Sequence, residues 1–134
     1  MNTTIPMITA LYAAIFGFLG AALTINVIRN RVRSGVSTGD GKDAMLAQAI
    51  RAHANFAEQV PLALIVISFA EVLGSRPLVV HVLCVVLVGA RLVSAYALNR
   101  SLAQTPQRNF AAAVTQLVVA AASAAILLAM AGVH

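Results

Sequence analysis

Three polar residues at helical spacing are the clearest sign of chemistry in this chain. At about 100° per residue, Arg51, Asn55 and Glu58 fall at about 0°, 40° and −20° on a helical wheel, which is one narrow stripe. The residues that follow, from Leu62 to Ala70, are apolar apart from Ser68. An ionised group at the centre of a bilayer costs about 2.5–3.5 kcal/mol, so we expect the stripe to face protein or a water-filled cavity. A cation, an amide and a carboxylate on one stripe form a polar socket.

The surrounding sequence is that of a polytopic membrane protein. Of its 134 residues 60% are hydrophobic and only 10% charged, and the mean hydropathy is +0.90. No charged residue lies between residues 5 and 28 or between 109 and 134. The net charge of +5 does not indicate nucleic acid, because the basic residues flank apolar spans and are not interleaved with aromatic residues.

Four apolar stretches predict four membrane-spanning helices over about residues 5–28, 44–73, 78–98 and 109–132. We expect them to form one transmembrane domain over residues 1–134, an all-α bundle with up-down-up-down order. The first stretch is longer than the core of a signal peptide and lacks its cleavage pattern, so we expect it to be retained as a helix. Asp40 or Asp43 is expected to cap the second helix.

The positions of Lys and Arg predict the orientation. The first connection with its flanks carries Arg29, Arg31, Arg33, Lys42 and Arg51, and the third carries Arg100 and Arg108, whereas the connection around residues 71–77 has only Arg76. By the positive-inside rule the two basic connections are cytoplasmic and both termini lie outside.

Further arginines are expected near the cytoplasmic ends of the helices, where they would surround the stripe. Arg91 could extend its side chain toward the interface or pair with Glu58 at a similar depth, and we favour the pair. Such a cluster is either a socket for a small anionic ligand or a purely structural polar cluster. The sequence contains no Cys/His metal cluster, glycine-rich phosphate loop or Ser/His/Asp arrangement. Cys84 stands alone in an apolar run and is expected to be packed and inert.

The run from Arg51 to Ile65, RAHANFAEQVPLALI, resembles the signature of the MAPEG family, the membrane-associated proteins in eicosanoid and glutathione metabolism. The R-x-x-x-N-x-x-E-x-x-P pattern is quite specific. The basic first connection with Gly39-Asp40-Gly41, an arginine in the third span and another before the fourth extend the resemblance over essentially the whole chain. Small bacterial members are the most similar, which implies a bacterial inner membrane.

The resemblance implies a homotrimer that binds glutathione between neighbouring subunits near the cytoplasmic face. Arg51, Asn55 and Glu58 would contact glutathione, with Glu58 meeting its amino group or orienting an arginine. Arg31, or Arg29 if the alignment shifts, matches the basic position that ends the first helix, and Arg91 matches the arginine of the third. Arg108, with Arg100 as a rival, would stabilise the glutathione thiolate. No metal is implied.

Ser94 and Leu98 occupy positions where eicosanoid-specific members carry Tyr or His. The resemblance therefore implies a general glutathione transferase or peroxidase acting on lipophilic electrophiles from the bilayer. Two alternatives remain open. One is a catalytically inactive trimer of the same fold, and the other is a small-molecule exporter that uses Glu58 as its membrane carboxylate.

Overall fold

The computed structural model describes residues 5–132 and consists of four α-helices. They are α1 (Met7–Ser34), α2 (Ala44–Val72), α3 (Pro77–Arg100) and α4 (Pro106–Met130). Each is long and apolar enough to cross a membrane. The prediction of an all-α bundle with four spans is confirmed.

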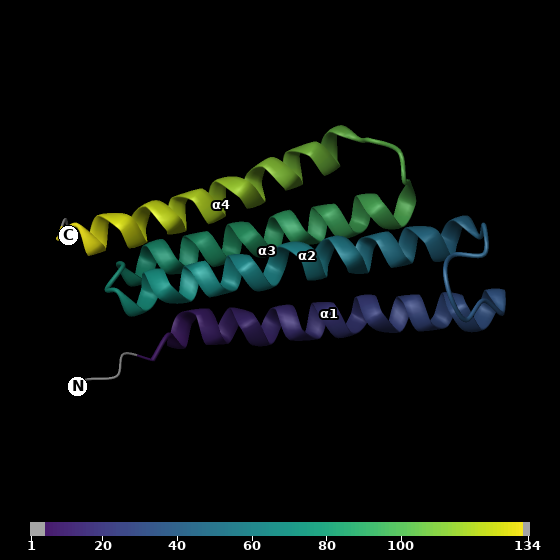
Figure 1. Cartoon of the computed structure of the whole chain (residues 1–134), viewed down its shortest axis with the longest axis horizontal. Helices are drawn as coiled ribbons and strands as arrows, with labels where there is room; N and C mark the ends of the chain where they lie inside the picture. Colours follow the sequence, from purple (N-terminus) through teal and green to yellow (C-terminus); the bar gives the residue numbers. More distant parts are fainter. Residues whose placement is uncertain (1–4, 133–134) are drawn as a thin grey trace.

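The helices run up-down-up-down, and α2 and α3 form the centre of the bundle (Figure 1). Helix α1 packs mainly against α2 on one side, and α4 packs against α3 and α2 on the other. Within residues 5–132, α1 and α4 do not contact each other. The connections 35–43 and 101–105 lie at one end, the basic end. The α2–α3 turn, the start of α1 and the end of α4 lie at the other, the turn end (Figure 1).

Two helices have an end that differs from the prediction by three or more residues, and local chemistry explains both. Helix α1 ends at Ser34, beyond residue 28, because arginine is a good helix former and Arg31 and Arg33 are favourable in a last turn. Gly35, with φ 68°, ends it and donates its N–H to the carbonyl of Arg31. Helix α4 starts at Pro106, before residue 109, because the Thr105 hydroxyl accepts from the N–H of Arg108 and proline fits a first turn.

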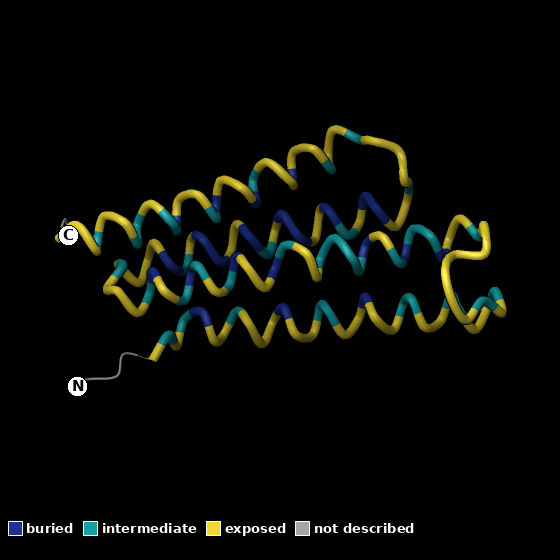
Figure 2. The backbone as a smooth tube through the Cα atoms, viewed as in Figure 1, coloured by how far each residue is buried: buried dark blue, intermediate teal, exposed yellow. Residues whose placement is uncertain are grey.

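The core lies along the inner faces of α2 and α3 (Figure 2). Phe16, Ile67, Leu87 and Val118 bring all four helices into one cluster. The outward faces of α1 and α4 are largely exposed and apolar, as at Phe18, which is 80% exposed. A surface of this kind is covered by lipid or by other protein chains.

Helices α1 and α2 are held together at two heights. A Cβ on Gly20 would lie 3.1 Å from the Phe56 ring, so glycine allows the two helices to approach closely there. At the turn end, the Glu71 carboxylate accepts hydrogen bonds from the backbone N–H groups of Ile8 and Thr9 and from the Thr9 hydroxyl. Glu71 therefore caps α1 from the end of α2.

Candidate ligand site at the basic end

Asp43 fixes the start of the helix that carries the stripe. Its carboxylate accepts from the backbone N–H of Leu46 at 2.8 Å and from Arg33 at 2.6 Å. The hydrogen bond from Leu46 and then that from Arg33 lower the pKa of Asp43 below its ordinary value. Of the two capping candidates, Asp43 is confirmed as the N-cap residue of α2.

Arg51 and Glu58 form an ion pair on the outer flank of α2. Their side chains approach to 3.3 Å, and they are 47% and 51% exposed. Arg51 also lines a groove of about 400 Å³, within the usual range of small-molecule sites. Its lining comes from the first loop, α2 and the α3–α4 connection: Gly39, Asp40, Ala47, Ile50, Arg51, Ala54 and Leu102.

Asn55 lies on the inner flank of the stripe and contacts α3. Its Oδ1 accepts from Arg91 Nη1 at 3.0 Å and from the Ser94 hydroxyl at 2.9 Å. The predicted pair between Arg91 and Glu58 is therefore wrong. The roughly 60° between Asn55 and Glu58 on the helix turns the amide toward α3 and the carboxylate toward the exposed flank, where it pairs with Arg51.

Arg91 is a buried cation, 2% exposed, whose partners are neutral. It donates to the Thr115 hydroxyl at 2.5 Å and to the carbonyl of Ala111 at 3.1 Å, so it ties α4 to α3 and α2. Neither ion pair within residues 5–132 includes Arg91, and its Nε has no partner there. Neither the role of Thr115 nor the hydrogen bond from Ser94 was predicted from the sequence. A lone threonine in α4 was the available signal.

The remaining candidate arginines lie at the basic end in different surroundings. Arg31 donates to the carbonyls of Val36 and Gly39 and so holds the first loop. Arg29 is exposed.

Arg108 donates through Nη1 to the carbonyls of Leu102 and Ala103, at 2.7 Å each. The Arg100 guanidinium lies over the ring of Tyr96, 4.6 Å from its centroid.

A single copy of the chain does not bring all of these residues together. Arg31 ends α1, whereas Arg108 begins α4, and these two helices lie on opposite sides of the α2–α3 pair (Figure 1). Arg51, Asn55, Glu58 and Arg91 do form a connected group through α2 and α3.

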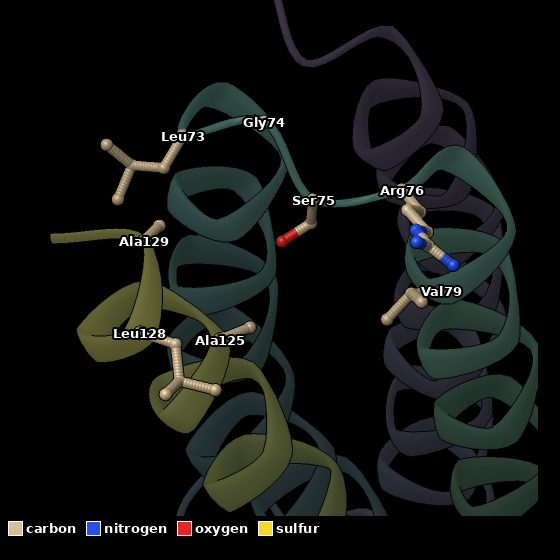
Figure 3. A pocket seen from close by; sticks show the side chains of 8 residues that line it. All are labelled: Leu73, Gly74, Ser75, Arg76, Val79, Ala125, Leu128 and Ala129. Atoms are coloured by element: carbon tan, nitrogen blue, oxygen red, sulfur yellow. The ribbon is translucent and has the colours of Figure 1, made fainter. Parts of the chain in front are cut away.

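A second hollow, of about 380 Å³, lies at the turn end between the α2–α3 turn and the last turns of α4 (Figure 3). Its polar side chains are Ser75, which points into the space, and Arg76. No carboxylate or amide side chain lines it. The basic end, with both charge signs and an amide, is the better candidate for recognising a charged small molecule.

The fold and the polar group at its basic end are those of a small four-helix integral membrane protein. The MAPEG family model matches residues 9–128, and the chain belongs to this family. It is 34% identical over 96 residues to the inner membrane protein YecN of Escherichia coli strain K12. These 96 residues are 72% of this chain and 73% of YecN. YecN of the O6:H1 strain CFT073 is similar to the same extent. The predicted family and the integral membrane location are confirmed.

Proposed function

We propose that this protein is a glutathione-dependent transferase or peroxidase that acts on lipophilic electrophiles at the cytoplasmic membrane face. The observation that carries the proposal is the exposed Arg51–Glu58 pair beside the groove, with the Asn55 amide next to it. Glutathione carries two carboxylates and one ammonium group. A cation, a carboxylate and an amide on one helical stripe match that pattern of charges.

The site is completed by a second subunit. The resemblance assigns ligand contacts both to the end of α1, at Arg31, and to the start of α4, at Arg108. Within residues 5–132, α1 and α4 do not contact each other. One ligand can therefore contact both Arg31 and Arg108 only where two copies of the chain meet. The exposed apolar faces of α1 and α4 supply surface for such contacts. This supports the homotrimer, with the site between protomers.

We assign to Arg108 the role of stabilising the glutathione thiolate. Its Nη1 is held by two loop carbonyls, which orients the guanidinium, and within residues 5–132 its other N–H groups make no hydrogen bond. A positioned cation favours a thiolate over a thiol. Arg100 is the weaker candidate because the Tyr96 ring already occupies one face of its guanidinium. Bound glutathione supplies the nucleophile, whose sulfur bonds to the electrophilic carbon while the leaving group departs with the electron pair.

The chain's own contribution is binding and charge stabilisation. The Arg51–Glu58 pair and Asn55 hold the tripeptide, and Arg108 holds the negative charge on sulfur. The electrophile enters from the bilayer beside α1 and α4. The exporter alternative is less well supported, because it needs an accessible free carboxylate and Glu58 is paired with Arg51.

The test is the ultraviolet absorbance of thiolate when the purified protein is titrated with glutathione near neutral pH. We expect a saturable signal in the parent protein and in Arg100→Gln, and its loss in Arg108→Gln. Glutamine keeps an N–H donor for the carbonyls of Leu102 and Ala103 and removes the charge. No thiolate signal in the parent protein would refute the enzyme proposal and favour an inactive family member.

A further inference from the structure

The amide of Asn55 is held in one direction by its neighbours on α3. Its oxygen accepts from two donors, Arg91 Nη1 at 3.0 Å and Ser94 Oγ at 2.9 Å. A carboxamide oxygen has two lone pairs, so both are occupied. Both donors are buried, at 2% and 6% exposure.

The reversed amide is strongly disfavoured. A guanidinium has only donors, so turning the Asn55 NH₂ group toward Arg91 would place donor against donor. Arg91 cannot move away easily, because Thr115 and the carbonyl of Ala111 fix its other end. The oxygen of Asn55 is thus held toward the interior.

The Asn55 nitrogen is left free on the side of the ligand. Within residues 5–132 it makes no hydrogen bond, and it is not among the buried polar atoms without a partner, so it is accessible. Arg51 and Glu58 lie on the same stripe and are exposed. The stripe therefore offers a cation, a pair of amide N–H donors and one carboxylate.

We infer that Arg91 and Ser94 are positioning residues that fix Asn55 as a hydrogen-bond donor toward an acceptor oxygen of the ligand. This inference rests on the proposed function for the identity of the ligand. It also gives Ser94, which stands where related enzymes carry an aromatic residue, a role inside the protomer.

Asn55→Asp tests the direction of the amide because aspartate has almost the same shape. Its inner oxygen still accepts from Arg91 and Ser94, and its charge is compensated by the guanidinium. We expect the melting temperature without ligand to equal or exceed that of the parent protein. The outer NH₂ becomes a carboxylate oxygen, so we expect the Kd for glutathione to rise at least about tenfold.

The matched control is Gln59→Glu, the same amide-to-acid change at a neighbouring position of α2. Gln59 Oε1 accepts from Gln116, and a glutamate oxygen can still do so. This variant places a similar charge near the site without altering position 55, and we expect a Kd within about threefold of the parent's, since exposed charges interact weakly.

Ser94→Ala should raise the Kd less than Asn55→Asp, because Arg91 still holds the amide oxygen, and Ser68→Ala should leave it unchanged because that hydroxyl bonds only to its own helix. A Kd for Asn55→Asp equal to or lower than the parent's would overturn the inference, as would a marked fall in its ligand-free melting temperature. If the parent protein binds no glutathione, the proposed function fails together with the ligand assignment, and the ligand-free melting temperatures still test whether Arg91 and Ser94 donate to the side chain at position 55.

Discussion

The guanidinium of Arg51 and the carboxylate of Glu58 lie 3.3 Å apart on the exposed flank of α2, two helical turns apart in sequence. Each group is neutralised by the other. Because each is about half exposed, both remain open to a ligand. A pair of this kind contributes little to stability, with a typical value of at most about 1 kcal/mol. Its arrangement beside the groove is better explained by recognition of a charged small molecule than by stability.

Glu58→Gln should therefore separate binding from folding. We expect a melting temperature close to that of the parent protein and a rise in the Kd for glutathione of roughly ten- to a hundredfold, the usual value of a hydrogen bond to a charged group. Calorimetric titration in detergent measures the Kd. A variant that unfolds readily but binds glutathione normally would contradict this role for Glu58.

Glu71, at the turn end, should affect folding and not binding. It accepts three hydrogen bonds at the start of α1, from Ile8 and Thr9. Glu71→Ala leaves these donors without their partner and should lower the free energy of unfolding by about 1–3 kcal/mol. Glutathione affinity should not change, because Glu71 lies at the far end of the bundle from the groove. Thermal unfolding and the same titration measure both quantities, and a loss of affinity would place Glu71 in the binding machinery.

Asp43 predicts a pH dependence. Its folded pKa lies below its ordinary value of 3.8, because the N–H of Leu46 and the Arg33 guanidinium favour the ionised form. The stabilisation is therefore complete above about pH 4 and is lost as the pH falls through the lowered folded value. An asparagine at this position would still cap the helix but would not titrate.

Melting curves of the parent protein and Asp43→Asn check this expectation. The parent protein should be the more stable one near neutral pH, and the difference should shrink under acid conditions. A constant difference at every pH would mean that the carboxylate of Asp43 does not contribute as described.

The orientation in the membrane that the basic connections predict can be measured directly. In a Cys84→Ser background, Ser37→Cys and Gln104→Cys should react with a membrane-impermeant thiol reagent only from the cytoplasmic side. Ser75→Cys, at the turn end, should react only from outside. Labelling of Ser75→Cys from the cytoplasm would reverse the predicted topology.

Hydropathy and capping chemistry predicted most of the fold. Four apolar stretches indicated the four helices, and the Asp43 cap was one of two candidates. Arg51, Asn55 and Glu58 lie on one helix, α2, as expected, but the contacts of Arg91 were not predicted, because a helical wheel places residues on a face without showing which neighbouring helix that face meets. The Arg91–Glu58 prediction failed for that reason.

Contacts between distant parts of the chain were the least predictable. Glu71 was expected near the α2–α3 connection, yet it also caps a helix that begins more than sixty residues earlier. Thr115, between Val114 and Gln116, showed no pattern, and its hydroxyl accepts from Arg91, the most buried charged residue within residues 5–132. Neither contact follows from local spacing, since each depends on which helices are neighbours.

Glutathione binding at the stripe can be measured through the melting temperature of the purified protein at increasing glutathione concentrations. A ligand that binds only the folded state at a hundred times its Kd adds about 2.7 kcal/mol of stability. We expect a saturable, concentration-dependent rise in the parent protein that is strongly reduced in Glu58→Gln. An unchanged melting temperature at millimolar glutathione, or an equal rise in both proteins, would contradict binding at this site.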